Sequence, residues 1–141
     1  MKRKASAHWS GNLNAGSGTL TTPSGVLSTT PYSFKDRFES GTGTNPEELI
    51  AAAHAGCFTM ALSLFLGNAG FTPDSLDTTA EVTLEQVKSA PAITSIHLSL
   101  KAKIPGISQE KFEELTAFAK ANCPVSKVLD TEITLEAVLE G

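Results

Sequence analysis

The sequence predicts an α+β fold in which antiparallel sheets surround a long buried helix, within a single domain spanning residues 1–141. Alternating apolar and polar residues predict strands in the first thirty residues and again beyond residue 78. Between these regions lies one apolar segment, Leu49–Leu66, which contains no charged residue. A chain of 141 residues has the length of one domain.

The N-terminal region is expected to form a meander of hairpins, because clusters of Ser, Gly, Asn and Pro separate its short strand-like segments. Tyr32–Glu39 is expected to be an extended piece that carries Arg37, followed by a glycine-rich loop over residues 41–45. The expected strands are Lys4–Trp9, Gly18–Thr22 and Val26–Thr30.

The long helix has clear start and stop signals. Thr44 or Asn45 can cap it, Pro46 suits the first helical position, and the two glutamates that follow complement the helix dipole. The glycines after Leu66 predict its end there.

This helix is apolar on every side, so it must be covered on every side. One sheet covers a single face, and we therefore expect a second copy of the chain to cover the other, in a symmetric homodimer. The segment approaches the length of a membrane span. A His and a Cys at its middle, and the absence of flanking Lys, Arg, Trp or Tyr anchors, favour a buried helix and no membrane.

Beyond Pro73 the pattern returns to strands, with two helical segments before the last strand. Ser108 is expected to cap the first of these helices, and Cys123-Pro124 to begin a short turn that runs through Leu129. The expected strands are Thr79–Val87, Ile93–Ile104 and Glu132–Leu139, and the apolar face of the first helix is Phe112, Leu115, Phe118 and Ala119.

Charge and cysteine content narrow the function classes. The net charge of −4 gives no reason to expect nucleic acid as a partner, and the basic cluster Lys2–Lys4 is too short to change this. The first fifteen residues lack the apolar stretch of a secretory signal, so we expect a cytoplasmic protein. Two cysteines in a reducing compartment are more often catalytic or metal-binding than a structural disulfide.

The two cysteines have different settings. Cys57 lies in the middle of the apolar helix, where a cysteine is commonly a small core residue. His54 shares its helix face, and either perturbs the thiol or is simply a core histidine. Cys123 precedes Pro124, at a helix cap where free backbone N–H groups favour the thiolate and lower its pKa.

Two such cysteines suggest a two-step peroxidase, in which a thiolate becomes a sulfenic acid and a second thiol condenses with it to a disulfide. The thiolate needs a nearby cation, for which Arg37 is the candidate, and a buried arginine needs a carboxylate. Glu47 lies ten residues before Cys57, or about 15 Å along a helix, so a link to the thiol must run through a long arginine or a partner subunit.

A zinc site is the other chemistry considered, but its candidate ligands lack the spacing of known zinc motifs. These candidates are Cys57, Cys123, His54 and His97.

Three stretches, Thr44–Ile50, Ala52–Phe58 and Cys123–Ser126, resemble the osmotically inducible protein C family, whose other main branch is the organic hydroperoxide resistance proteins. Arg37 in its Arg-Phe-Glu stretch, and His54, are similar to the osmotically inducible branch. The resemblance extends over nearly the whole chain, including Ala7–Trp9, Gly25–Leu27 and Gly70–Pro73.

The resemblance implies an intertwined homodimer, with two long central helices wrapped by sheets that exchange strands and with active sites at the subunit interface. It implies that Cys57 is the peroxidatic nucleophile, that Cys123 resolves it, that Arg37 stabilises the thiolate and that Glu47 holds the arginine. It further implies reduction by external dithiols, lipoyl groups in particular, and no metal, haem or flavin cofactor.

The aromatic content around the motifs predicts an apolar pocket that favours alkyl hydroperoxides over hydrogen peroxide, formed by Phe34, Phe38, Phe58 and Met60. The competing hypothesis is a non-enzymatic stress protein that binds a small apolar molecule at the dimer interface. A general thiol–disulfide oxidoreductase is disfavoured, because the chain has no C-x-x-C motif.

Overall fold

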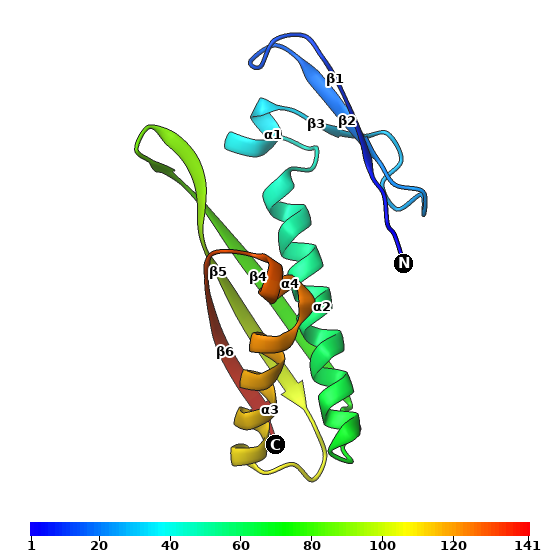
Figure 1. Cartoon of the computed structure of the whole chain (residues 1–141), viewed down its shortest axis with the longest axis vertical. Helices are drawn as coiled ribbons and strands as arrows, with labels where there is room; N and C mark the ends of the chain where they lie inside the picture. Colours follow the sequence, from blue (N-terminus) through cyan, green and yellow to red (C-terminus); the bar gives the residue numbers. More distant parts are fainter. The chain divides into compact units, whose positions relative to one another are not determined.

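The computed structural model describes residues 1–141 as two compact units, Met1–Leu49 (unit 1) and Ile50–Gly141 (unit 2). The chain contains six strands in two three-stranded sheets, and four helices (Figure 1). The predicted α+β class is confirmed.

Unit 1 is built on the antiparallel sheet β1-β2-β3. Gly18 sits where the backbone of one neighbouring strand and the ring of Tyr32 approach closely, and a Cβ there would overlap both. The ring of Trp9 packs on Tyr32 with centroids 5.5 Å apart, which gives the sheet an aromatic contact. The strands are β1 (Ser6–Ser10), β2 (Ser17–Thr21) and β3 (Thr30–Tyr32).

The strand expected over Val26–Thr30 does not form, and β3 begins only at Thr30. Instead, the backbone N–H of Thr22 donates to the carbonyl of Leu27 at 2.8 Å, and the N–H of Leu27 donates to the Thr22 hydroxyl at 3.1 Å. Gly25 in this loop has a φ of +79°. The Pro-Ser-Gly turn chemistry therefore closes a loop through the segment that was expected to be a strand.

Tyr32–Glu39 is likewise not an extended piece, because it contains helix α1 (Phe34–Phe38). The Ser33 hydroxyl accepts a hydrogen bond from the N–H of Asp36 at 3.2 Å and donates to its carboxylate at 2.7 Å. Serine followed three residues later by an acid is a helix-start signal, and alternation of aromatic and polar residues obscured it.

The long helix is α2 (Pro46–Asn68), which confirms the predicted start and extends two residues beyond the predicted end. Asn45 caps it by accepting the N–H of Glu48 at 2.7 Å. At its end the N–H of Phe71 donates to the carbonyl of Leu66 at 2.9 Å, and Gly70 adopts a φ of +89°. This is the glycine-dependent helix stop that the sequence predicted.

Unit 2 carries the second sheet, in the order β4-β5-β6. β4 (Ser75–Val87) and β5 (Ala90–Lys103) form a long antiparallel hairpin whose turn residues, Lys88 and Ser89, both have positive φ. β6 (Glu132–Glu140) pairs with β5 in parallel, which corrects the expectation of antiparallel sheets throughout. The reason is the helical crossover between β5 and β6, which returns the chain to the end of the sheet where β5 began.

The crossover consists of α3 (Gln109–Asn122) and α4 (Pro124–Val128), which confirms both predicted segments. The Ser108 hydroxyl caps α3 by accepting the N–H of Lys111 at 3.1 Å. Phe118, expected on the buried face of α3, is 51% exposed and packs edge-on against Phe65 of α2.

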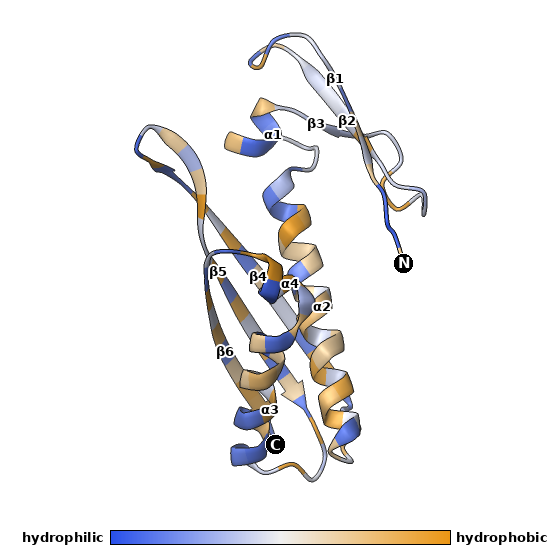
Figure 2. Cartoon of the chain, viewed as in Figure 1, coloured by the Kyte–Doolittle hydropathy of each residue, from blue (hydrophilic) through white to orange (hydrophobic).

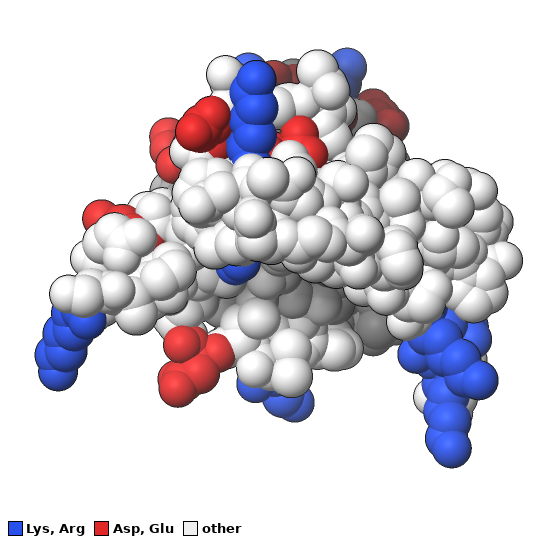
Figure 3. All heavy atoms as spheres, turned by 90° about the horizontal axis from the view of Figure 1, so that it is seen from above, with Lys and Arg blue, Asp and Glu red and all other residues white.

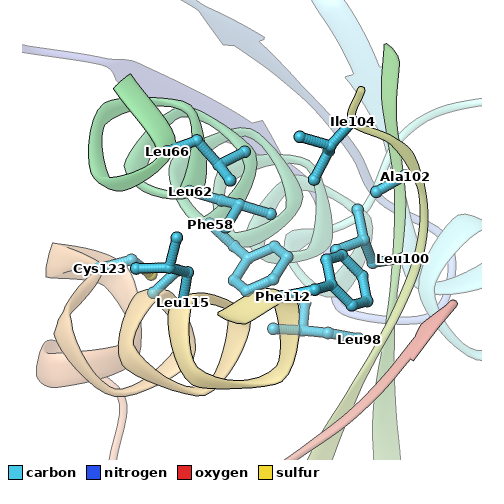
Figure 4. Close-up of a cluster of buried hydrophobic side chains, with 11 residues drawn as sticks. Phe58, Leu62, Leu66, Leu98, Leu100, Ala102, Ile104, Phe112, Leu115 and Cys123 are labelled. Carbon is cyan, nitrogen blue, oxygen red and sulfur yellow. The ribbon is translucent and has the colours of Figure 1, made fainter. Parts of the chain in front are cut away.

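The core of unit 2 lies where α2, β5 and α3 meet (Figure 4). Three apolar side chains from each of these elements interdigitate, and Cys123 closes the cluster at its edge. The residues from the three elements are Phe58, Leu62 and Leu66; Leu98, Leu100 and Ala102; and Phe112, Leu115 and Ala119.

Apolar residues run along all of α2 (Figure 2), and the helix is long and apolar enough to cross a membrane by length and composition. Within the chain one face packs into the core, and only 22% of its most apolar window is buried. Met60 is 76% exposed and Leu64 59% exposed. The chain itself therefore buries only one face of α2, whereas the sequence predicted burial on every side.

Candidate active site

Unit 1 places the predicted arginine and carboxylate together. Arg37 donates from Nη2 to Oε1 of Glu47 at 2.8 Å, and from Nε to Oε1 and Oε2 at 3.1 and 3.3 Å. Glu47 is buried, whereas the Arg37 side chain is 39% exposed. The guanidinium also lies over the ring of Phe38, 5.3 Å from its centroid. The forked pairing fixes the plane of the guanidinium and leaves its Nη1 edge available to another ligand.

Asp36 holds the loop that brings Arg37 and Glu47 together. Its carboxylate accepts the N–H of Gly43 at 2.8 Å, and its carbonyl accepts the side-chain amide of Asn45 at 3.2 Å. A Cβ on Gly41 or Gly43 would overlap the same carboxylate, which explains the glycines of this loop. The sequence analysis missed Asp36, although its position three residues after Ser33 was a usable signal.

Unit 2 brings together two cysteines that stand 66 positions apart in the sequence (123 − 57). Both are free thiols; Cys57 is partly exposed and Cys123 is fully buried. Cys123 caps α4, as predicted, with its Sγ accepting the N–H of Ser126 at 3.3 Å. Cys57 packs against the core cluster that contains Cys123, and the Cys123 side chain acts on the pKa of the Cys57 thiol, so the two thiols lie near each other.

The surroundings of Cys57 within unit 2 disfavour its thiolate. Burial raises the pKa of the Cys57 thiol, a hydrogen bond from the backbone of Val125 opposes this, and the Cys123 side chain raises the pKa further through its hydrogen bond and its charge. Because the thiolate is the nucleophile, this cysteine needs a cation that unit 2 does not supply to it.

His54 is fully buried, and its Nε2 hydrogen-bonds to the Ser126 hydroxyl at 2.7 Å. Burial lowers the pKa of the imidazole, which keeps it neutral near pH 7. Its hydrogen bond is made to α4 rather than to Cys57, and Ser126 also lies 3.1 Å from the Cys123 sulfur. The sequence analysis did not single out Ser126 as a functional residue; its place three residues after a capping cysteine was the available signal.

The four residues expected to bind substrate belong to both units, two to each. Phe34 and Phe38 pack against each other in unit 1, with ring centroids 4.9 Å apart. Met60 lines an open cleft of about 1230 Å³ in unit 2, between α2 and the strands β4, β5 and β6. Phe58 lies in the core with no exposed surface, so its ring is engaged in packing rather than presented to a ligand.

No group of three or more His, Cys, Asp or Glu side chains is arranged to hold a metal ion. His97, one of the residues considered for a zinc site, instead hydrogen-bonds to Thr134 on the neighbouring strand of the second sheet.

The Asp36 interactions predict a pH-dependent stability. Hydrogen bonds from Gly43 and Ser33 lower the pKa of the Asp36 carboxyl. A carboxyl whose pKa is lowered on folding adds stability that is complete above its unfolded pKa of about 4 and is lost as the pH falls below it. Urea unfolding at pH 7 and pH 3 should therefore show a smaller acid-induced loss for Asp36→Asn than for the unaltered chain. Equal losses in the two proteins would contradict this role, and Asp74→Asn is the matched control.

Comparison with known proteins shows the family to which this chain is related. The family model described as OsmC-like protein matches residues 39–138. The chain is 55% identical over 141 residues to peroxiredoxin OsmC of Escherichia coli (strain K12), covering 100% of this chain and 99% of that protein.

A second relative is the organic hydroperoxide resistance protein OhrB of Bacillus subtilis (strain 168), 30% identical over 123 residues, which are 87% of this chain and 89% of that protein. The crystal structure of Bacillus subtilis OhrB matches the fold with a TM-score of 0.67 at 27% identity, covering 97% of this chain and 98% of that one. From the matched family model and these relatives, we conclude that this chain belongs to the OsmC-like protein family.

Proposed function

We propose that this chain is a thiol-dependent peroxidase that reduces organic hydroperoxides to alcohols in oxidative and osmotic stress defence. The observation that carries the proposal is the pair of free thiols, one partly exposed and one buried, that the fold brings near each other from separate helical segments. The names of the relatives, a peroxiredoxin and an organic hydroperoxide resistance protein, support the same chemistry. The whole chain acts as a single peroxidase domain.

In the proposed reaction the Cys57 thiolate attacks one peroxide oxygen, the O–O bond breaks, and the alkoxide leaves to take up a proton as the alcohol. Cys57 is thereby oxidised to a sulfenic acid. The Cys123 thiol then attacks the Cys57 sulfur, and a disulfide forms with release of water. An external dithiol then reduces the disulfide, with lipoyl groups as the first candidate.

Arg37 is proposed to supply the cation that Cys57 lacks, stabilising the thiolate and then the departing alkoxide. Its forked pairing with Glu47 supports this, because a guanidinium held in one plane can direct its remaining N–H groups at a reacting oxygen. Arg37 and Glu47 belong to unit 1 and Cys57 to unit 2.

A second copy of the chain is proposed to complete the structure as a homodimer. The exposed face of α2 is apolar or small, and it adjoins the open cleft beside the second sheet. Removing such a face from water is favourable in proportion to its apolar area. A twofold-related α2 offers the complementary surface.

Phe34, Phe38 and Met60 are proposed to give the site its preference for alkyl hydroperoxides over hydrogen peroxide. Phe38 is 38% exposed and Met60 is 76% exposed, so both present apolar surface to a ligand. No part of this proposal requires a metal, haem or flavin.

The protein is proposed to act in the cytoplasm, without nucleic acid or a membrane as partner. On the face shown in Figure 3, Lys and Arg side chains stand in small separate groups, with Asp and Glu side chains and uncharged surface among them. The net charge of −4 agrees with the absence of an electrostatic footprint for nucleic acid.

The peroxidase proposal predicts the behaviour of the two cysteine variants in stopped-flow reactions with cumene hydroperoxide. The unaltered reduced chain should consume the peroxide repeatedly with a dithiol, Cys57→Ser should be inactive, and Cys123→Ser should stop as a sulfenic acid after one turnover. Hydrogen peroxide should react more slowly than cumene hydroperoxide. If the unaltered chain and Cys57→Ser are equally inert with monothiols and dithiols, the proposal fails in favour of a non-enzymatic module that binds an apolar molecule.

The role of Arg37 predicts a shift in the pKa of Cys57, measured from the pH dependence of its alkylation in a Cys123→Ser background. Removing a cation destabilises the thiolate, so Arg37→Met should raise the pKa by about 1–3 units, and alkylation at pH 7 should slow about tenfold or more. Lys35→Met, which removes a neighbouring charge of α1, is the matched control. An unchanged profile in Arg37→Met would show that the arginine does not act on Cys57.

The homodimer predicts a molecular mass of twice 14.8 kDa in sedimentation equilibrium. Leu64→Glu places a charge on the exposed face of α2, where burial of an unpaired carboxylate is costly, and should shift the protein towards monomer. Leu13→Glu changes an apolar residue of similar exposure in a turn and serves as the control. A monomeric unaltered chain would contradict the proposal.

A further inference from the structure

We propose that His54 and Ser126 form a proton relay that activates Cys123 for its attack on the Cys57 sulfenic acid. The Ser126 hydroxyl lies between the other two groups, 3.1 Å from the Cys123 sulfur and 2.7 Å from Nε2 of His54. This inference deepens the proposed function, and rests on the resolving role given there to Cys123.

Cys123 has the chemical problem that such a relay would solve. Its side chain is fully buried, so no solvent contacts the thiol to take up its proton. The thiolate is nevertheless the form that attacks sulfur. A proton acceptor is therefore needed within hydrogen-bonding reach, and the hydroxyl of Ser126 connects the thiol to one.

His54 is suited to be that acceptor. The imidazole is fully buried on α2, and its Nδ1 has no hydrogen-bond partner in the protein. A neutral imidazole with the proton on Nδ1 leaves Nε2 free to accept a proton from the Ser126 hydroxyl. Because Nδ1 has no hydrogen-bond partner, His54 cannot pass a proton from this atom to another protein group. The proton that His54 accepts at Nε2 therefore returns through Ser126.

The transfer balances in protons and electrons. As the Cys123 sulfur bonds to the Cys57 sulfur, its proton passes to the Ser126 oxygen, and the Ser126 proton passes to Nε2 of His54. The S–O bond of the sulfenic acid breaks, and the leaving hydroxide receives the proton that the relay returns. The products are the Cys57–Cys123 disulfide and water, and no further oxidant or reductant is used.

The geometry at α4 also orients the nucleophile. Ser126 donates its backbone N–H to the Cys123 sulfur and places its hydroxyl against the same atom. Cys57 packs against the core cluster to which Cys123 belongs. Ser126 and His54 are thus positioning and proton-transfer groups for the second chemical step, whereas the first step takes place on Cys57.

The test separates the two steps in a single turnover of the reduced full-length chain with one equivalent of cumene hydroperoxide. Trapping of sulfenic acid with dimedone reports the first step, and loss of free thiols reports closure of the disulfide. Because general base catalysis contributes on the order of 100-fold or more, His54→Gln and Ser126→Ala should each slow closure by about that factor. The double variant should be no slower than either single one, because both residues serve one path.

Two further variants distinguish proton transfer from mere packing. Ser126→Thr keeps the hydroxyl, so its disulfide should close at a rate within about threefold of that of the unaltered chain. If Ser126 mattered only for its small size, the larger threonine would slow closure as much as Ser126→Ala does. His97→Gln alters an unrelated histidine and should leave closure unchanged. Closure at the unaltered rate in both His54→Gln and Ser126→Ala, or equal slowing by Ser126→Thr and Ser126→Ala, would overturn the relay.

A second reaction keeps this inference separable from the peroxidase proposal. Ellman's reagent converts the more exposed Cys57 to a mixed disulfide, and attack by Cys123 then releases thionitrobenzoate, which is measured by its absorbance. This closure needs deprotonation of Cys123 but no peroxide. If the chain proves inert to hydroperoxides, slow release in His54→Gln and Ser126→Ala still supports the relay, and unaltered release overturns it.

Discussion

The packing of the α3–α4 crossover against α2 is the interaction on which the site in unit 2 depends. β6 pairs in parallel with β5, so the chain must return along the sheet between them, and it does so as helix. Phe112, Leu115 and Ala119 bury the returning helix against α2 and the sheet. The break between α3 and α4 then falls beside the middle of α2, which brings Cys123 near Cys57. The apolar core thus determines the distance between two thiols that are remote in sequence.

The electrostatics of the chain are divided between its two units. Unit 2 holds a thiol whose pKa is raised by burial, and a neutral histidine whose pKa is lowered by the same cause. Unit 1 holds a guanidinium whose geometry is fixed by a buried carboxylate. Each arrangement is chemically incomplete alone, because the thiol lacks a cation and the arginine lacks a second anionic partner.

The open face of α2 poses a related problem of solvation. In water, a long helix that exposes Met60 and Leu64 leaves apolar surface unburied, and so does the cleft beside the second sheet. A proposed second copy removes both surfaces from water with one symmetric contact. The small residues along this face would let two helices approach closely, whereas larger side chains would hold them apart.

Much of the fold and part of the site were predictable from the sequence alone. The caps of α2 and α3, the stop after Leu66 and the restart at Pro124 are encoded within a few residues of each feature, and the structure confirms them. Local turn and cap chemistry was misjudged at Val26–Thr30 and Phe34–Phe38, where alternation suggested extended chain. Only the tertiary structure decided the parallel pairing of β6, the burial of Phe58 and the contact of His54 with Ser126. The physical reason is that hydrogen-bonded caps and periodic patterns act over one or two turns, whereas these contacts join residues that only the collapse of the core brings together.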